Sequence, residues 1–494
     1  AASVASLGTG ASGGREGPIS LIGAGLGAWA ARRLGLTVRD RRILLAAGIA
    51  GGIAAVFRAP LAAAIFAAEV LYRGPDLEAD VLIPAFIAAV VGYLAGTLGL
   101  DLLGPLAGHQ GVLASTVFQA PAVAFRVADW PHLAGYTLVA GACALVARGF
   151  IGLQAGVTGR FDRLAVPFWI KPGIGAGIAG LVAVAVFLAL ATALGSRDEA
   201  RIGLSTIGSG YGVVHWLFAG LGAPFHHLVL AGLLLVIALA KTLTTALCVG
   251  SGGSAGLFGP VIVIGGCTGG AIGLALEGLP VAPPMPACVL MGMAGLLAAT
   301  HRTPVAALLM VAEIAGSYLL LLPAMWVSGT AFLLVGRRSL IGGQVDSPAD
   351  SPAHRAEGMR GALADLRVAD LLDPGTRSVV APDLGIEQVQ QRLTECPALA
   401  VVGADGRLHG LIDRDGLHGW APDPYLRALI RAVDLADGAA LALRPGDSVA
   451  TALQRFRQHR VEVLAVTAGD GRFIGLLTAA ALMGAIRDRM EPRP

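Results

Sequence analysis

Long apolar segments fill the first two thirds of this chain, up to about position 336. The clearest of them are Ile83–Leu98, Tyr136–Val157, Ile174–Leu194, Leu228–Leu247 and Leu319–Val335. A helix needs roughly 20 apolar residues to cross a bilayer, and these segments reach that length or a large part of it. The pattern therefore predicts a bundle of membrane helices, some of which span the bilayer while others end part-way.

Several of the apolar segments are interrupted by proline. The interruptions are Gly17-Pro18, Ala59-Pro60, Gly259-Pro260 and Thr303-Pro304. A helix can end at membrane depth only where its unpaired backbone groups face protein or a polar cavity. In transporters, broken helices of this kind lie along the path of the substrate.

The interruptions belong to an internal repeat. GREGP at Gly14–Pro18 returns 242 residues later as GLFGP at Gly256–Pro260, and Arg58–Glu69 returns 244 residues later as Arg302–Glu313. Two motifs in the same order at nearly the same spacing indicate two related halves. The second half has well over 80 residues of membrane segments before its glycine motif, whereas the first has only 13. We therefore expect on the order of a hundred further residues in front of Ala1.

The composition changes after the last apolar segment, which Arg337 and Arg338 follow directly. Residues 342–365 form a linker rich in Gly, Ser, Pro and Asp. Beyond it, strands and amphipathic helices alternate, and Leu399–Ile412 recurs 65 residues later as Leu464–Leu477. Each copy is typical of a strand, an Asp-Gly hairpin turn and a second strand. The tail is therefore predicted to be a tandem pair of small α/β modules.

Composition supports a membrane protein and excludes two other classes. Of the 494 residues, 55% are hydrophobic and only 14% are charged, and the mean hydropathy is +0.72. Soluble proteins carry about 25% charged residues, so a wholly soluble enzyme is excluded. The net charge of +3 is too small for a nucleic-acid binder. The five cysteines show no metal-ligand spacing, so neither a metal site nor a disulfide framework is expected: Cys143, Cys248, Cys267, Cys288 and Cys396.

The candidate chemistry lies at the two repeated, glycine-rich helix starts. Gly13–Pro18 opens an apolar helix in the first half, and Gly252–Pro260 opens one in the second. A helix N-terminus presents uncovered N–H groups and positive potential. Two of them related by a pseudo-two-fold axis would form an anion site without a full positive charge, which suits rapid passage. The alternative interpretation is that these are packing glycines with prolines in the first helical turn.

Glu16 lies at the start of the first of these helices. The helix dipole by itself favours a carboxylate there by up to about 1 kcal/mol, which is the structural interpretation. An ionisable side chain at membrane depth is also a functional candidate. Ionised, it would compete with an anion for the same amides, and protonated, it would leave. We therefore expect a gate that responds to pH.

These motifs, in this order and spacing and with a tandem α/β tail, resemble those of the CLC family of chloride channels and proton-coupled chloride antiporters. Gly14–Pro18 is similar to the GREGP element of the family, Gly256–Pro260 to its GxFxP element, and the tail to its cytosolic CBS pair. The resemblance covers nearly the whole chain. It implies an α-helical membrane protein, an inverted-repeat bundle of broken, tilted helices, followed by a soluble α/β tandem CBS pair.

The resemblance also implies domains and site residues. The domains are a transmembrane pore domain at residues 1–341, the linker at 342–365 and a cytosolic CBS pair at 366–494, with modules at about 366–420 and 431–489. Glu16 is the implied gating glutamate, and the amides of Leu257 and Phe258 are implied to contact the anion. The full implied anion-binding set is Gly14, Arg15, Glu16, Gly17, Gly256, Leu257, Phe258, Gly259 and Ile341.

The chain departs from the family pattern at three points. The first anion motif of the family, a GSGxP loop, has no match and should lie in the missing front part. The central pore tyrosine is expected near Ser339, and Ile341 occupies its place. Val70 stands where the antiporters carry an inner proton-transfer glutamate, which is a feature of the channel branch. The neighbouring Glu69 has a counterpart in Glu313, which favours a shared structural role.

Two further features have competing interpretations. Lys241, inside the apolar segment Leu228–Leu247, is a candidate for an electropositive pore mouth, and a lysine that snorkels from a helix end is the alternative. CBS pairs often bind adenine nucleotides through an Asp that follows a Thr by three residues at the exit of the second strand. The two copies carry Gly416 and Ala481 at that position, so nucleotide binding has little support. A structural or dimerising role is preferred, and no other cofactor is expected.

The expected function is anion conduction through a CLC-type pore gated by Glu16, without enzymatic activity. Val70 and Ile341 favour a chloride channel over the alternative, a coupled Cl⁻/H⁺ antiporter. The paired helix starts disfavour a membrane scaffold with a ligand-sensing tail. The excess of arginine over lysine indicates a bacterial inner membrane, and the positive-inside rule places Arg337 and the tail in the cytosol.

The family further implies a homodimer in lipid, with one pore in each subunit. The helices that would join the subunits are similar to the apolar segments Leu61–Leu71, Ile83–Leu98, Pro304–Ile314 and Leu319–Phe332. Their near absence of charge is consistent with burial between subunits, although lipid contact would select the same composition.

Overall fold

The chain forms two compact units, Ala1–Pro348 and Ala349–Pro494. The computed structural model describes residues 2–103, 118, 120–121, 123–220, 225–351, 354, 366–372, 378–413, 429–438, 442–459 and 461–490. Most of the predicted linker and the predicted end of the first tail module at residue 420 lie outside these residues.

The first unit is helical. Its α-helices, in chain order, are α1 (Ala2–Gly8), α2 (Glu16–Arg33), α3 (Val38–Phe57), α4 (Pro60–Glu69), α5 (Ala79–Leu103), α6 (His132–Asp162), α7 (Lys171–Leu194), α8 (Arg197–Ala200), α9 (Tyr211–Phe218), α10 (His227–Gly250), α11 (Phe258–Ala275), α12 (Met285–His301), α13 (Pro304–Ala315) and α14 (Leu321–Val335). Short 3-10 turns are η2 (Val127–Asp129) and η3 (Arg201–Thr206), and a third, η4 (Pro348–Asp350), crosses the boundary to the second unit.

Within the described residues, five helices are long and apolar enough to cross a membrane: α5, α6, α7, α10 and α11. Four of them contain segments that the apolar pattern predicts. The fifth predicted segment, Leu319–Val335, becomes α14, which has only 15 residues. At 1.5 Å per residue it is about 22 Å long, short of the ~30 Å hydrocarbon core.

The internal repeat is visible as two matching runs of helices, α2 to α5 and α11 to α14. Helices α2 and α11 have 18 residues each. Helices α3 and α12 both end at an arginine in the left-handed region, Arg58 with φ 55° and Arg302 with φ 63°. Both following helices start with proline, Pro60 and Pro304. The left-handed arginine ends one helix and the proline, whose φ suits a first turn, begins the next.

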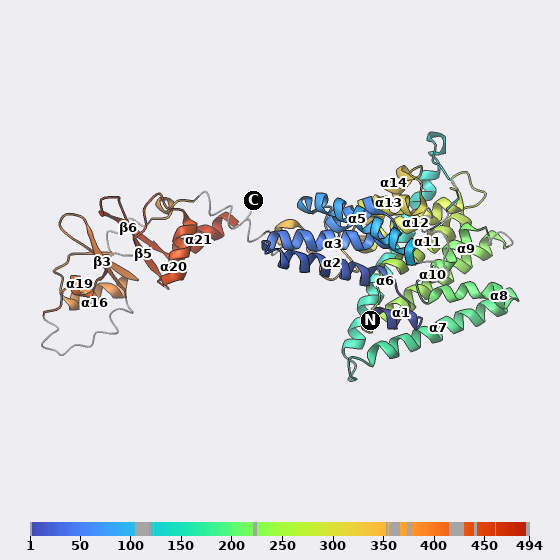
Figure 1. Cartoon of the computed structure of the whole chain (residues 1–494), viewed down its shortest axis with the longest axis horizontal. Coiled ribbons are helices and arrows are strands. Elements are labelled where there is room, and N and C mark those ends of the chain that lie inside the picture. The colour runs from blue at the N-terminus through green and yellow to red at the C-terminus, as the bar shows by residue number, and fades with distance from the viewer. Residues whose placement is uncertain are drawn as a thin grey trace. The chain divides into compact units, whose positions relative to one another are not determined.

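The first two helices of each run pack closely side by side, α2 against α3 and α11 against α12 (Figure 1). A Cβ atom on Gly23 would overlap the carbonyl oxygen of Gly48, and one on Gly265 would overlap that of Gly292. Glycine is required at these crossings because backbone meets backbone. Small residues that allow this approach are typical of helix packing in membranes. The crossings hold the N-terminal ends of α2 and α11 in place.

The tail contains two small sheets with flanking helices (Figure 1). Its elements are η5 (Val368–Leu371), β1 (Val379–Val380), α16 (Ile386–Glu395), β2 (Ala398–Val402), β3 (Leu408–Asp413), α19 (Ala432–Leu435), β4 (Asp437–Gly438), α20 (Val449–His459), β5 (Val463–Thr467), β6 (Phe473–Thr478) and α21 (Ala479–Met490). The first sheet has the order β1-β2-β3-β4, in which β1 is parallel to β2 and the other pairs are antiparallel; β5 and β6 form the second sheet. The two hairpins share one register, since Ala400 pairs with Leu411 and Ala465 with Leu476.

The two tail modules exchange short segments. Leu366 and Val368, at the start of the tail, lie in one hydrophobic cluster with Leu443 and Phe456 of the second module. Ala432, which begins the second predicted module, lies in the cluster of the first, with partners such as Leu399. The core of each module therefore contains residues from both predicted sequence ranges. The boundaries of the two modules stay predictions.

Candidate functional site

The two glycine-rich helix starts meet, as the internal repeat predicts. The backbone N–H of Gly14 donates to the carbonyl of Gly256, and the N–H of Gly256 donates to the carbonyl of Gly14, both at 2.7 Å. A Cβ on Gly256 would lie 2.7 Å from the nitrogen of Gly17, so the two backbone segments cross without room for a side chain. Helices α2 and α11 begin two residues beyond this bridge.

The first turns of α2 and α11 have no side-chain caps. The N-cap residues, Arg15 and Leu257, have right-handed helical geometry, and neither side chain accepts a hydrogen bond from the helix. Leading N–H groups of a helix that lack such caps carry the positive end of the helix dipole. Two positive ends are thus directed toward the Gly14–Gly256 bridge, both of whose glycines are buried.

The Glu16 side chain lies at this junction and is only 1% exposed. Its Oε1 accepts a hydrogen bond from the Tyr211 hydroxyl at 2.6 Å. Its Oε2 has no hydrogen-bond partner among the described residues. A Cβ on Gly14 would overlap Oε2, and one on Gly259 would lie 3.1 Å from it. The carboxylate of the first helix therefore reaches across to the start of the second, with one oxygen left unpaired.

Phe258 is the first residue of α11, and its ring lies in an aromatic cluster. Its ring packs against Phe57, Phe66 and His301, with centroid separations of 4.7, 5.5 and 5.4 Å. This aromatic cluster holds the first residue of α11 in place. The arrangement is compatible with the predicted amide contact.

Tyr211 is the site residue that the sequence did not reveal. It opens α9, and its ring packs edge-on against Phe118 at 5.4 Å. The separation of 195 residues between Tyr211 and Glu16, and its position outside both repeated motifs, conceal the contact in the sequence. The one local signal is Gly210, whose φ of +79° makes a turn directly before the tyrosine.

Comparison with known proteins decides the family. Residues 1–336 match the model of the voltage-gated chloride channels over about two thirds of the chain. The chain belongs to this family, the CLC family. It is accordingly an integral membrane protein of a family that transports anions. Residues 434–488 match the CBS domain model, and the predicted fold, a CLC helix bundle followed by a CBS tail, is confirmed.

Relatives cover the membrane unit. A ClcB-like protein from Ralstonia nicotianae is 28% identical over 341 residues, 67% of this chain and 70% of that protein. The H⁺/Cl⁻ exchange transporter ClcA of Vibrio cholerae is 29% identical over 349 residues, 68% of this chain and 65%, slightly less than two thirds, of that protein. The crystal structure of a CLC-type fluoride/proton antiporter shares the fold, with a TM-score of 0.50 at 24% identity over 68% of this chain and 73% of that chain.

Val70 and Glu69 lie where the two CLC halves touch again. The Glu69 carboxylate accepts hydrogen bonds from the N–H groups of Val305 and Ala306, at 3.0 and 2.8 Å, in the first turn of α13. Glu313 does the same for Leu61 and Ala62 of α4, at 3.2 and 2.8 Å. The shared structural role predicted for Glu69 and Glu313 is confirmed. The Val70 carbonyl accepts a hydrogen bond from the Gln344 side chain at 2.8 Å.

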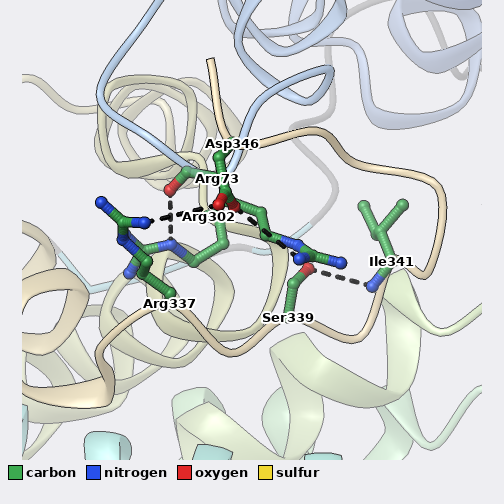
Figure 2. A network of polar contacts seen from close by, with 6 residues as sticks. All are labelled: Arg73, Arg302, Arg337, Ser339, Ile341 and Asp346. Carbon is green, nitrogen blue, oxygen red and sulfur yellow. Dashed lines mark hydrogen bonds and ion pairs between the residues drawn. The ribbon is translucent and has the colours of Figure 1, made fainter. Parts of the chain in front are cut away.

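Ile341 lies in a different polar network, shown in Figure 2. Its N–H donates to the Ser339 hydroxyl at 3.0 Å. In the same network, the Arg302 guanidinium donates to the carbonyl of Arg73 at 2.9 Å, and Asp346 lies between the guanidinium groups of Arg73 and Arg337, at 3.7 and 3.4 Å. The aliphatic side chain of Ile341 provides no hydrogen-bond donor, and its anion contact remains a prediction.

Lys241 does not snorkel from a helix end. It lies in the interior of α10 with 0% exposure. Its ammonium donates to the carbonyl of Gly208 at 2.7 Å and to that of Ile207 at 3.3 Å. The snorkelling interpretation is wrong because a mid-helix lysine that faces the bundle reaches backbone acceptors more readily than water. These hydrogen bonds hold the loop before Tyr211 in place. The pore-mouth role stays a prediction.

The described residues contain no group of three or more His, Cys, Asp or Glu side chains that could hold a metal ion.

Proposed function

We propose that this protein carries chloride across the membrane past the Gly14–Gly256 bridge, with Glu16 as a pH-responsive gate. One observation supports this most directly: a buried carboxylate lies between two uncapped helix starts, with one oxygen bonded to Tyr211 and the other unpaired. A carboxylate oxygen in that position occupies a site that suits a small anion.

The gate follows from electrostatics. A buried charge without full pairing is costly, and here the helix dipoles and the Tyr211 hydroxyl compensate it. An ionised Glu16 therefore blocks the site by offering the same negative charge as chloride. Protonation removes the attraction, so the side chain leaves and an anion takes its place. Low pH opens the gate, and neutral pH favours the closed state.

We further propose that conduction proceeds without stoichiometric proton transport. Val70 has no titratable side chain, and both oxygens of the adjacent Glu69 accept hydrogen bonds from helix α13. Coupled Cl⁻/H⁺ antiport is the second candidate, because the Vibrio cholerae relative is an H⁺/Cl⁻ exchange transporter.

The gate is tested by Glu16→Gln, which keeps the volume and removes the charge. In reconstituted liposomes, chloride efflux of Glu16→Gln should persist at neutral pH and lose most of its pH dependence. Glu16→Asp, with a shorter reach, should retain part of it. If Glu16 only stabilises the helix start, the Gln variant costs under about 1 kcal/mol and its pH profile stays that of the wild type. That result would refute the gate.

A proton measurement on the same liposomes separates the two transport modes. With Val70 at the inner position, a chloride gradient should drive no stoichiometric proton movement in the wild type. A steady proton counterflow that scales with chloride flux would contradict the channel proposal and support coupled antiport.

The assembly and its orientation are also proposals. We propose a homodimer joined through α4, α5, α13 and α14, which expose apolar side chains such as Leu61, Ile83 and Leu322. A monodisperse monomer in mild detergent that still conducts after reconstitution would contradict it.

We place the CBS tail in the cytosol of a bacterium, with the inner membrane as the location, because Arg32 and Arg33 end α2 and Arg337 follows α14. Labelling that puts Arg337 and the tail on opposite sides would reject this orientation.

Adenine-nucleotide binding by the CBS tail keeps little support. The Thr478 hydroxyl accepts a hydrogen bond from the N–H of Ala481 at 3.1 Å and so caps α21. Its position is thus explained by the fold. Saturable ATP or AMP binding to the full-length protein in equilibrium dialysis would overturn the structural interpretation of the tail.

A further inference from the structure

We propose that the Tyr211 hydroxyl is a ligand of the transported anion as well as of the gate. It holds the Glu16 carboxylate in the closed site and donates the same hydrogen bond to the anion once the carboxylate has left. This inference rests on the proposed function of Glu16 and adds a side-chain donor to a site otherwise made of backbone.

The geometry places the hydroxyl at the start of α11. The hydroxyl is 2.6 Å from Glu16 Oε1, a distance typical of an O–H donor facing a carboxylate. A Cβ on Gly259 would lie 3.0 Å from the hydroxyl and 3.1 Å from Glu16 Oε2. Hydroxyl and carboxylate therefore border the same small space beside Gly259. An ion that replaces the carboxylate there lies within reach of the same donor.

The tyrosine is held so that it cannot follow the gate. Phe118 packs edge-on against its ring. The preceding loop is fixed by the Lys241 ammonium, which donates to the Gly208 carbonyl at 2.7 Å. A Cβ on Gly210 would lie 2.6 Å from the Ser205 carbonyl oxygen and 3.1 Å from the Lys241 ammonium, so that turn has little space to move. When Glu16 leaves, the hydroxyl stays and loses its acceptor.

A donor left without an acceptor in the protein interior is costly, and an anion restores the bond. The charged groups that act on this point favour an anion as well. Arg15 interacts electrostatically with Tyr211, and the ammonium form of Lys241 with Glu16. The ligand class is a small inorganic anion that accepts hydrogen bonds, and chloride is the one the proposed function supplies.

The test measures chloride binding with the gate removed. Isothermal titration of detergent-purified, full-length Glu16→Gln protein gives the reference affinity. Adding Tyr211→Phe, which deletes one oxygen and keeps the ring against Phe118, should weaken chloride binding about ten- to a hundred-fold, the size of a hydrogen bond to a charged group. The control is Tyr93→Phe in the same background. Tyr93 lies on α5 and packs against the apolar core, so the chloride affinity of this control variant should equal that of the reference.

Liposome efflux of the single variant Tyr211→Phe provides a second measurement. Because the carboxylate loses a stabilising donor, half-maximal opening should move to higher pH. If Tyr211→Phe changes neither the chloride affinity nor the pH profile, the role of Tyr211 is overturned; the gate itself still stands as long as Glu16→Gln flattens the profile. If Glu16→Gln leaves the pH profile unaltered, the proposed function fails.

Discussion

At the scale of single residues, the junction depends on positions where nothing larger than hydrogen fits. Gly14 is the sharpest case, because a Cβ there would overlap Glu16 Oε2 and lie 3.0 Å from the nitrogen of Gly259. The carboxylate is the end of a flexible side chain and can move away, whereas the backbone of α11 cannot. A methyl group at this position would therefore occupy the space that the proposed anion needs.

We expect Gly14→Ala to reduce chloride flux at least ten-fold at every pH, with the protein still folded. Flux is measured in liposomes and folding by gel filtration in detergent. Gly25→Ala is the matched control, because Gly25 lies in α2, the helix that Gly14 precedes, and a Cβ there meets no atom within 4 Å. Its flux should equal that of the wild type. If both alanine variants conduct alike, the space beside Gly14 is not on the anion path.

At the scale of elements, the two halves stabilise each other by reciprocal capping. Glu69, at the end of α4, satisfies the first N–H groups of α13, and Glu313, near the end of α13, satisfies those of α4. A short helix at membrane depth needs such acceptors, because no water reaches its leading N–H groups. One carboxylate at each end thus replaces the caps that the Pro60 and Pro304 starts lack.

Replacing Glu69 by alanine should destabilise the protein by about 3 kcal/mol, since the N–H groups of Val305 and Ala306 lose their carboxylate acceptor. Glu313→Ala should cost less, because Glu313 is less deeply buried than Glu69, which is 2% exposed. The midpoint of thermal unfolding in detergent orders the two variants, and Glu199→Ala on the exposed helix α8 is the control. A Glu69 variant as stable as the control would show that the caps contribute nothing.

At the scale of the whole molecule, the tail cannot be divided where its sequence repeat suggests. Leu366 and Val368 complete the core of the second module, and Ala432 that of the first. Ala398 and Ala400 of β2 also pack with Val463 of β5, so the hairpins share a third cluster. Each module buries apolar surface that the other supplies.

A fragment of residues 366–489 should therefore unfold cooperatively in urea, whereas fragments 366–430 and 431–489 should each lack a cooperative transition. Circular dichroism follows all three fragments, and mixing the two halves should restore part of the transition. Two halves that each unfold cooperatively would mean that the exchanged segments are dispensable. Either outcome concerns the tail unit alone, which the contacts set apart from the first unit.

Much of the fold of this protein can be predicted from its sequence because the sequence signals for helices and for the repeat are local. Apolar length predicts the long helices, proline inside an apolar segment predicts the broken ones, and an offset of about 243 residues predicts that Gly14 and Gly256 are equivalent. Equivalence in a two-fold repeat only places two positions at equal distances from the axis. That the two helix starts meet was expected because, side by side, they would form an anion site. The shared role of Glu69 and Glu313 followed from the same symmetry.

Only the tertiary structure decided the contacts that break the symmetry or cross long stretches of chain. Tyr211 belongs to neither repeat, and the glycine before it indicates a turn but not a contact with Glu16. Lys241 has a charge that suggests a pore mouth, but its surroundings, backbone carbonyls of a distant loop, determine what it does. A repeat specifies which positions correspond, and periodicity specifies which face of an element is apolar. Which polar atom finally meets which depends on packing, and that exists only once the chain has folded.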